Sequence, residues 1–327
     1  MEEILFTAIK GIKVGHAENL EAATGCTVIL CEEGAVGGVD VRGGAPGTRE
    51  TELLNPLNLV EKLHAVLLAG GSAFGLDAAA GVMSYLEEKG IGFDVGVTTV
   101  PIVGAAVLFD LLVGDYKIRP DKEMGYKACE NASSQPPLQG TIGAGTGATI
   151  GKCLGPEYAM KGGVGSYGIK VGDLMVAALV AVNSFGDVVD PSTGEVISGA
   201  LSPDGLSFAN TEKVLLQQYN NNKNLFTGNT TIGVIATNGK LTKAGASKVA
   251  SMAHNGYARS IRPAHTMVDG DTIFTMATGE VEADISATGL LAAKVMEEAV
   301  VRAVKHATSL DGLKCYADCH PEHSEGS

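Results

Sequence analysis

Strand-like and helix-like apolar patterns occur along the whole length of this chain, and their distribution is the strongest constraint on its fold. Four apolar runs read as buried strands: Cys26–Leu30, Ala65–Ala69, Met175–Val182 and Thr231–Ala236. The third run is ambiguous by periodicity alone, but Asn183 and Gly186 follow it and favour a strand. Three further segments carry apolar residues at helical spacing: 73–89, 242–258 and 287–306. This pattern predicts an α/β fold.

No segment of distinct composition divides the 327 residues into two halves, so we expect a single domain, 1–327. The 44 glycines lie mostly in short clusters between apolar runs, which suits tight turns in a compact protein. A chain that is 45% hydrophobic can bury a large core. The one long polar stretch, 220–229, is interpreted as an exposed loop inside the domain.

The charge balance and the cysteine pattern limit the classes of function. A net charge of −13 argues against binding to nucleic acid, which needs clustered Lys and Arg, and against anionic membrane surfaces. The N-terminus carries no signal-peptide pattern, and no run approaches the ~18 apolar residues of a membrane span. The six cysteines are scattered, as reduced thiols of a cytoplasmic protein would be.

The junction Asn229-Thr230 carries the most interesting chemistry. It lies where the polar stretch meets the apolar run that begins at Thr231. If this bond were cut, Thr230 would carry a hydroxyl nucleophile and a free α-amine with a pKa near ~8. These two groups form the core of an N-terminal-nucleophile hydrolase. An ordinary boundary between loop and strand is the alternative, and the dipeptide alone favours it.

Two glycine-rich segments resemble known motifs without matching them. Gly143-Ala144-Gly145, with Ala148 in the third position of a dinucleotide fingerprint, lacks a strong strand before it. A structural turn or one wall of a substrate site is the better interpretation. The segment Gly70–Gly75 departs from the Gly-x-Ser-x-Gly elbow by one residue. A tight strand-to-helix turn is expected there, although a helix N-terminus could also bind an anion.

Several polar residues could belong to a site. Asp269 and Asp271 form an i, i+2 pair before an apolar run, and Asn183 ends a predicted strand, where its amide could donate to an oxyanion. Taken singly, each is more simply a turn residue. The C-terminal segment also contains potential metal ligands, but their spacing matches no zinc pattern, and we expect a frayed tail without metal. These ligands are Cys315, Cys319, His320 and His323.

Long blocks of the chain, in order, resemble one family. The sequence is similar to the DmpA-like aminopeptidases, peptidase family S58, and most similar to their nylon-oligomer endohydrolase branch. The matching blocks are Gly11–His16, Gly38–Glu50, Ala69–Leu76, Gly143–Lys152, Asn229–Asn238 and Arg262–Asp271.

The resemblance carries expectations about fold and assembly. It implies an αββα sandwich of the self-cleaving type that ornithine acetyltransferases share. Cleavage before Thr230 would give an α chain, 1–229, and a β chain, 230–327, that stay associated as part of a homotetramer. The resemblance also implies a small peptide or amide substrate and no metal or organic cofactor. Candidate substrates are N-terminal residues of short peptides, β- or D-peptides and ω-amino-acid oligomers.

The resemblance also implies roles for individual residues. Thr230 would be the nucleophile and Asn183 would stabilise the oxyanion. Asp269 and Asp271 match an acidic pair that supports the nucleophile, and Lys161 matches a lysine of the nylon-hydrolase branch. A second group would lie along the substrate, with a phenylalanine where some relatives have a tyrosine: Phe109, Gly143 and Gly145.

Two other functions remain open at this point. An acyltransferase of the ornithine acetyltransferase type would share the fold, but the usual Ala-Thr-Met-Leu cleavage signature is absent. A non-catalytic binding protein could retain the fold without processing. The presence of Thr230, Asn183 and both aspartates disfavours that second alternative.

Overall fold

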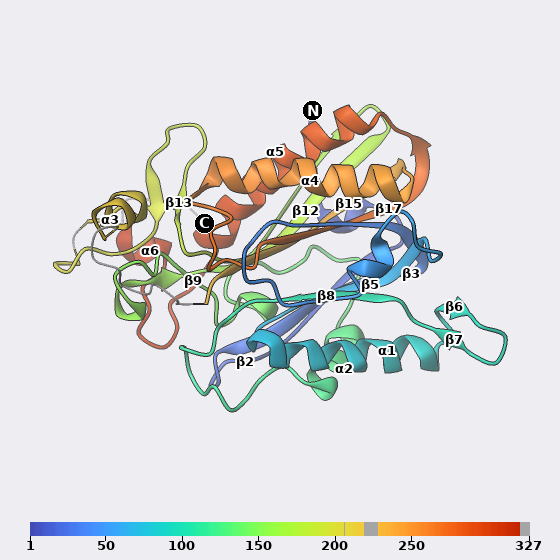
Figure 1. The fold of residues 1–327 in the computed structure, drawn as a ribbon, viewed down its shortest axis with the longest axis horizontal. Coiled ribbons are helices and arrows are strands. Elements are labelled where there is room, and N and C mark those ends of the chain that lie inside the picture. The colour runs from blue at the N-terminus through green and yellow to red at the C-terminus, as the bar shows by residue number, and fades with distance from the viewer. Residues whose placement is uncertain (206, 219–227, 321–327) are drawn as a thin grey trace.

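The computed structural model describes residues 1–205, 207–218 and 228–320 (Figure 1). The helices in these ranges are α1 (Ala78–Glu88), α2 (Lys122–Glu130), α3 (Thr211–Gln218), α4 (Lys243–Ser260), α5 (Ile285–Lys305) and α6 (Tyr316–Cys319). The strands before the middle of the chain are β1 (Glu2–Ile4), β2 (Ile12–Asn19), β3 (Thr24–Val41), β4 (Thr48–Arg49), β5 (Lys62–Ala69), β6 (Phe93–Asp94), β7 (Thr99–Val100) and β8 (Val103–Val107). Those that follow are β9 (Thr149–Ile150), β10 (Met160–Lys161), β11 (Gly163–Val171), β12 (Leu174–Asn183), β13 (Asp187–Val189), β14 (Val196–Ser198), β15 (Thr230–Lys240), β16 (Ile261–Arg262) and β17 (Thr272–Glu282).

The long strand β3 connects two halves of one large mixed sheet. The order of that sheet is β1-β11-β12-β15-β17-β3-β5-β8-β4, with β2 also paired to β3. The first part of β3 pairs with β2 and β5, and its last part, from Val36 to Val41, pairs with β17. The register with β5 shifts between Leu30 and Ala35. Such an irregularity bends a strand and increases its twist, so the two halves fold over one another.

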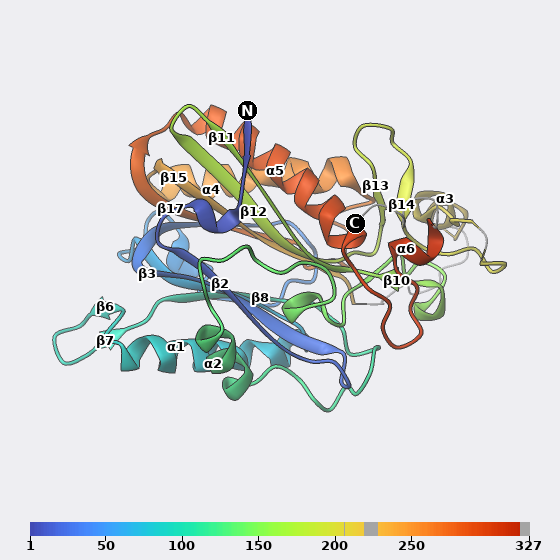
Figure 2. The same cartoon turned by 180° about the vertical axis from the view of Figure 1, so that it is seen from behind.

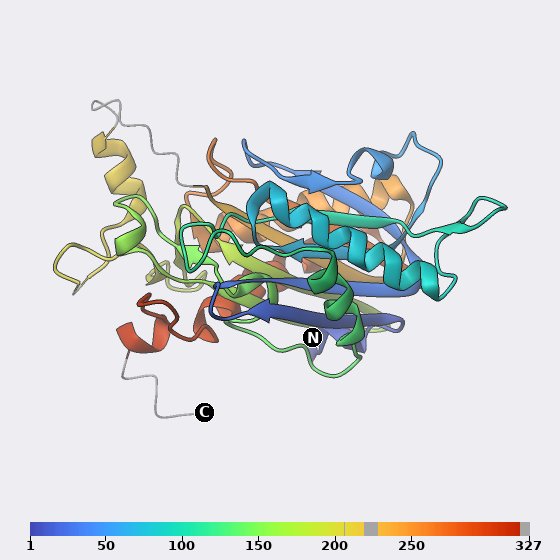
Figure 3. The ribbon, with the colours of Figure 1, turned by 90° about the horizontal axis from the view of Figure 1, so that it is seen from below.

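The halves of the sheet and the helices form four layers (Figures 1 and 2). Helices α4 and α5 pack on β12, β15 and β17 through one apolar cluster. A second cluster lies between the two halves of the sheet, where Val66 and Leu68 of β5 meet Leu179 of β12 and Val234 of β15. Helices α1 and α2 cover the other half through a third cluster (Figure 3). The predicted αββα sandwich is therefore confirmed.

The predicted elements agree with the structure except at their ends. All four predicted strand runs lie inside observed strands. Helix α4 begins after Thr242, whose hydroxyl accepts a bond from the Gly245 N–H at 3.1 Å, and α5 begins after Asp284, which accepts from Ala287 N–H at 2.8 Å. The helix expected over 73–89 starts instead as a 3₁₀ turn, Ser72–Asp77, before α1. Most of the predicted polar loop, residues 220–227, lies outside the described residues.

The described part of the C-terminal segment is folded and contains helix α6, so the expectation of a frayed tail is wrong for that part. Asp318 accepts a bond from Cys315 N–H at 2.9 Å and another from the Ser309 hydroxyl, and these bonds cap α6. The described residues contain no cluster of three potential metal ligands. His323 lies outside the described residues. All six cysteines are described and carry free thiols.

No helix within the described ranges combines the length and the hydropathy that crossing a membrane requires.

Candidate active site

Asn183 and Thr230 face each other across two neighbouring strands. Asn183 is the last residue of β12 and Thr230 is the first of β15, and the antiparallel register pairs them directly. Thr230 is 4% exposed and Asn183 is fully buried. Two residues that are 47 positions apart in sequence numbering therefore meet at one end of the central sheet.

The peptide bond between Asn229 and Thr230 is held from one side by the segment that carries the two aspartates. The N–H of Asn229 donates to the carbonyl oxygen of Val268 at 3.2 Å, and the N–H of Gly270 donates to the carbonyl oxygen of Asn229 at 2.9 Å. The hydroxyl of Thr230 also bonds this carbonyl oxygen. The carbonyl of Asn229 is therefore polarised by an N–H donor with a hydroxyl beside it.

Gly270 lies against the side chain of Thr230. A Cβ atom built on Gly270 would lie 2.6 Å from Oγ1 of Thr230 and 2.8 Å from the carbonyl oxygen of Ala45. Carbon–oxygen contacts of this length are too short for any residue with a side chain. The glycine between the two aspartates is thus required by the position of the threonine.

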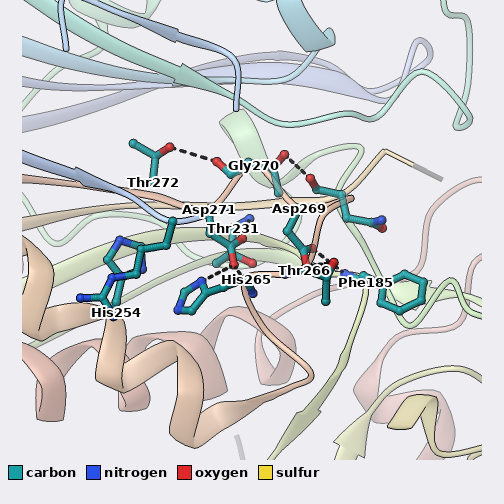
Figure 4. Close-up of polar contacts among 12 residues, drawn as sticks. Phe185, Thr231, His254, His265, Thr266, Asp269, Gly270, Asp271 and Thr272 are labelled. Atoms are coloured by element: carbon teal, nitrogen blue, oxygen red, sulfur yellow. Dashed lines mark hydrogen bonds and ion pairs between the residues drawn. The ribbon is translucent and has the colours of Figure 1, made fainter. Parts of the chain in front are cut away.

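Asp271 connects the start of β15 to a histidine (Figure 4). Its Oδ1 accepts a bond from the N–H of Thr231 at 2.8 Å. Its Oδ2 accepts from the N–H of His265 at 3.0 Å and lies 2.8 Å from His265 Nδ1. The side chain of Asp271 is 2% exposed. This carboxylate fixes the residue that follows Thr230, so it controls where β15 begins.

Asp269 is the second buried carboxyl group of the pair. Its Oδ2 accepts bonds from the N–H of Thr266 at 2.9 Å and from the hydroxyl of Thr266 at 2.5 Å. Its Oδ1 accepts a longer bond from the N–H of Phe185 at 3.4 Å. Burial, reinforced by the charge of Asp271, raises the pKa of Asp269 from 3.8 to about 6. The group can therefore exchange a proton close to neutral pH.

His265 is held in an unusual backbone conformation beside a second histidine. Its φ is +59°, in the left-handed region. Its ring packs edge-on against His254 with centroids 4.8 Å apart. His254 Nε2 lies 3.0 Å from the carbonyl oxygen of Asp40, and burial lowers the pKa of His254 to about 4. The aspartate–histidine pair therefore rests on a neutral, packed ring.

The side chain of Asn183 uses both ends of its amide. Its Oδ1 accepts bonds from Thr149 N–H at 2.9 Å and from Lys152 Nζ at 3.1 Å. Its Nδ2 donates to the carbonyl oxygen of Phe109 at 2.9 Å. The amide therefore joins the end of β12, the strand next to that of Thr230, to the loop that carries Phe109.

Lys152 is buried against Asn183, although sequence analysis assigned it no role. Its Nζ donates to the carbonyl oxygen of Thr149 at 2.8 Å and to the hydroxyl of Thr149 at 2.9 Å, in addition to Asn183. Burial lowers the pKa of Lys152 to about 7, and the charge of Asp269 opposes that shift. An amine that titrates near neutral pH next to the predicted oxyanion residue is a candidate for proton transfer or charge stabilisation.

Lys161 lies in a different environment from Lys152. Its Nζ donates to three main-chain carbonyl oxygens, those of Gly145, Ala148 and Gly162, at 2.8 to 2.9 Å. It is fully buried, and burial lowers its pKa to about 7. Three bonds to backbone carbonyls use all the donors of an ammonium group. The contacts of Lys161 therefore organise the glycine-rich turn.

The two glycines expected along the substrate lie in that turn. Gly143 and Gly145 form a 3₁₀ turn (Gly143–Gly145) and are buried. A Cβ at Gly143 would lie 2.7 Å from His16 Nδ1, and one at Gly145 would lie 2.8 Å from the Gly140 carbonyl oxygen. Among described residues, neither glycine lines the cavities beside Phe109. Their observed contacts are those of close packing.

Two cavities flank Phe109. One, of about 110 Å³, contains the junction residues Gly228, Asn229 and Thr230 on one wall and Ser72 on another. The other, of about 310 Å³, is lined by Thr149, Lys152, Glu157 and Asp311, among others. Phe109 borders both cavities, so it lies between the space around the nucleophile and the larger space beside Lys152.

The turn at Gly70–Gly75 supports the Phe109 loop. Gly71 has a φ of +82°, and its N–H donates to Asp110 Oδ1 at 2.7 Å. The Thr24 hydroxyl donates to the other oxygen of Asp110 at 2.7 Å. The N–H of Ser72 donates to the carbonyl oxygen of Leu108 at 2.9 Å. The expected tight strand-to-helix turn is confirmed, and it positions the loop at the site.

The comparisons with known sequences agree on one family. A profile of peptidase family S58 matches residues 5–316. A Mycobacterium leprae protein described as an uncharacterized aminopeptidase is 43% identical, over 96% of this chain and 94% of its own length. A 6-aminohexanoate-oligomer endohydrolase of Paenarthrobacter ureafaciens is 32% identical, over 93% of this chain and 86% of its own length.

Solved structures have the same fold at lower identity. The L-aminopeptidase D-Ala-esterase/amidase of Ochrobactrum anthropi, described as a variant of the Ntn hydrolase fold, superposes with a TM-score of 0.71 at 19% identity, over 94% of this chain and 87% of its own. A β-aminopeptidase of Burkholderia sp. gives a TM-score of 0.68 at 21% identity, over 99% of this chain and 95% of its own.

Proposed function

The chain belongs to peptidase family S58, and from that membership we propose that it is a self-processing amide hydrolase whose nucleophile is the N-terminal Thr230 of its own β chain. Self-cleavage between Asn229 and Thr230 gives residues 1–229 and 230–327. The mature enzyme acts on a small peptide or amide, in the manner of an aminopeptidase or an ω-amino-acid oligomer hydrolase.

One arrangement supports this proposal above all others. The Asn229 carbonyl receives the Gly270 N–H at 2.9 Å and lies against the Thr230 hydroxyl. An N–H donor aimed at a carbonyl oxygen stabilises the negative charge that develops there when the carbonyl is attacked. A buried hydroxyl beside that carbonyl is the attacking group that an acyl shift requires.

The self-cleavage step proceeds in two stages. The Thr230 hydroxyl loses its proton and its Oγ1 attacks the carbonyl carbon of Asn229. The bond from that carbon to the Thr230 nitrogen breaks, the nitrogen takes up a proton, and an ester remains. Water then adds to the ester and displaces Oγ1. The products are a carboxylate on Asn229 and a free amine and hydroxyl on Thr230.

The mature site carries out both stages of this chemistry on a substrate: acyl transfer to Oγ1, then hydrolysis of the ester by water. The Thr230 amine, with a pKa near ~8 in ordinary N-termini, accepts the proton of its own hydroxyl as that oxygen attacks the substrate carbonyl. The Gly270 N–H and the amide of Asn183 stabilise the oxyanion. Asp271 holds the start of β15 through the N–H of Thr231, and Asp269, whose pKa is raised to about 6, carries the nearby proton. No metal or organic cofactor takes part in these steps.

Lys152 supplies positive charge on the far side of Asn183. Its Nζ bonds Asn183 Oδ1 at 3.1 Å, and its pKa of about 7 allows it to lose or gain a proton at working pH. We propose that Lys152 orients the Asn183 amide. We propose that Lys161 supports the turn that carries Lys152, through its three bonds to main-chain carbonyls.

The family also suggests an assembly and a location. We propose a cytoplasmic homotetramer of processed protomers that binds neither nucleic acid nor membranes, in keeping with the net charge of −13. Size-exclusion chromatography with light scattering tests the assembly.

A denaturing gel with intact-mass measurement tests the proposed function. The purified chain should convert into two fragments, one of which begins at Thr230, while Thr230→Ala should remain whole. Hydrolysis of 6-aminohexanoate oligomers and of aminoacyl p-nitroanilides, with and without an added amine acceptor, should then follow the processed form. An unmutated 33.5 kDa chain that stays intact after long incubation would overturn the mechanism.

A further inference from the structure

The main chain of Gly228 packs directly on the ring of Phe109. A Cβ atom built on Gly228 would lie 2.6 and 2.7 Å from the two Cδ atoms of the ring, and closer still to Cγ. Carbon atoms in contact normally lie about 3.5–4.0 Å apart. The φ of Gly228 is +52°, which adds a smaller preference for glycine. Any side chain at this position would therefore overlap the ring.

The main chain that carries the ring is held on both sides, so the ring can move away only by rotation about its own side-chain bonds. Asn183 Nδ2 donates to the carbonyl oxygen of Phe109 at 2.9 Å. The preceding residue, Leu108, donates to the Ala69 carbonyl at 2.8 Å. The following residue, Asp110, is buried and accepts bonds from Gly71 N–H and the Thr24 hydroxyl, both at 2.7 Å. Phe109 is thus fixed to the central sheet through its neighbours.

The segment opposite the ring is held equally firmly. Asn229 donates to the Val268 carbonyl at 3.2 Å and accepts from Gly270 N–H at 2.9 Å, and it is 2% exposed. Gly228, one residue upstream, has little freedom to shift. An added methyl group can be accommodated only by displacing one of the two bonded segments or by turning the ring from its position, and overpacking of this kind raises the energy of the packed state.

In the proposed self-cleavage, Gly228 and Asn229 take the place that the acyl part of a substrate takes during turnover. In the proposed self-cleavage, the ester on Thr230 Oγ1 carries Asn229 as its acyl residue, with Gly228 behind it. The same oxygen carries the acyl group of a substrate during turnover. In a substrate whose chain continues behind the acyl residue, the atoms that occupy the place of Gly228 must therefore pass the Phe109 ring.

We propose that Phe109 is a specificity-determining residue that admits only an unbranched chain behind the residue to be cleaved. Glycine or an unsubstituted methylene chain passes the ring, whereas a residue with a Cβ is excluded. This inference rests on the proposed function, and it names the substrate class as amides whose acyl part is unbranched at that point. The small cavity of about 110 Å³ beside Thr230 is consistent with so narrow a passage.

The chain is its own first substrate, so complementary substitutions test the proposal without a known substrate. Gly228→Ala should slow self-cleavage by at least about tenfold, as expected for an overpacked site. Phe109→Ala alone should still cleave, and adding Phe109→Ala to Gly228→Ala should restore most of the lost rate. Phe109→Leu serves as a second variant if the alanine form folds poorly. Gly172→Ala is the matched control, since Gly172 has a φ of +58° and nothing within 4 Å of an added Cβ.

The processed enzyme provides a second readout. Gly-Asn-p-nitroanilide should be cleaved at least about tenfold faster than Ala-Asn-p-nitroanilide, and Phe109→Ala should bring the two rates close together. Normal cleavage of Gly228→Ala, or no rescue by Phe109→Ala, would overturn this inference and leave the proposed function standing. A wild-type chain that never cleaves would overturn the proposed function and this inference with it.

Discussion

The side-chain amide of Asn183 donates to the main-chain carbonyl oxygen of Phe109 at 2.9 Å while its own oxygen accepts from Lys152 at 3.1 Å. Asn183 is also the strand partner of Thr230. One side chain, at the end of the strand beside that of the nucleophile, therefore joins the buried lysine to the main chain of Phe109, whose ring packs on Gly228. The orientation of the amide depends on both bonds, and the second hydrogen of Nδ2 is left to donate to an oxyanion.

Asn183→Asp tests this orientation with almost no change in volume. The carboxylate keeps an acceptor for Lys152 but loses both Nδ2 hydrogens, the one that bonds Phe109 and the one that the proposed function assigns to the oxyanion. We expect self-cleavage to slow by on the order of a hundredfold, the usual effect of removing one amide donor from an oxyanion site. The rate is measured by intact mass over time. A variant that folds normally, by circular dichroism, and cleaves at the wild-type rate would contradict the assigned role.

Lys152→Met should mainly slow self-cleavage, whereas Lys161→Met should mainly lower the stability of the fold. Lys152→Met removes the bond that holds Asn183 Oδ1, so we expect slow cleavage with modest loss of stability. Lys161→Met leaves three buried carbonyls without their donor, so we expect a loss of stability on the order of 3 kcal/mol. Urea unfolding in the uncleavable Thr230→Ala background, paired with cleavage rates in the native background, separates the two. Equal effects on both measurements would contradict the distinction.

The buried lysines should also make stability depend on pH. The pKa of Lys161 is lowered from 10.5 to about 7 in the folded chain. Between these values the unfolded chain binds a proton that the folded chain does not, so the free energy of unfolding rises with pH. We expect Thr230→Ala to gain stability from pH 7 to about 8.5, below the main titration of free thiols. The gain should be smaller when Lys161→Met is added, and an unchanged slope would count against a buried neutral lysine.

Asp269 should have the opposite effect to Lys161: at lower pH, its contribution to the free energy of unfolding falls as the pH rises. Its pKa is raised from 3.8 to about 6, so between these values the folded chain binds a proton that the unfolded chain lacks. The contribution of Asp269 to stability is therefore present below pH 4 and is lost as the pH rises to 6. In the Thr230→Ala background, Asp269→Asn should become more stable relative to its parent across this window. Urea unfolding at pH 4, 5 and 6 measures the difference, and a constant difference would contradict the shift.

Sequence patterns predicted the strands and helices well, because long apolar runs act locally. The runs inside β12 and β15 are of this kind. The pairing of Asn183 with Thr230 was suggested only through family resemblance. Which strands become neighbours depends on packing across the whole sheet.

The environments of individual polar groups were harder to foresee. Lys152 and Lys161 are nine residues apart in one glycine-rich region, and sequence gives no indication which of them reaches Asn183. The turn at β9 and the burial of both amines determine that Lys152, and not Lys161, bonds Asn183. Gly270 looked like an ordinary turn glycine between two aspartates. Its need to be glycine comes from Thr230, 40 positions earlier.

The last prediction concerns His265, which holds Asp271 through both its N–H and its ring. The ring Nδ1 lies 2.8 Å from Asp271 Oδ2, and the backbone φ is +59°. Asparagine tolerates this conformation and its side-chain N–H₂ can take the place of Nδ1–H. Alanine provides no such donor and is strained at this φ, and glycine removes only the donor.

We therefore expect His265→Asn to retain most of the self-cleavage rate, and His265→Gly and His265→Ala to lose at least about tenfold, since a bond to a charged partner contributes about 1.5–3 kcal/mol. Because glycine fits the backbone without strain, a slow His265→Gly assigns the loss to the missing donor and not to φ. Intact-mass kinetics at several pH values give the comparison. If His265→Gly cleaved as fast as His265→Asn, the ring would be a packing group, and Asp271 would depend on its main-chain donors alone.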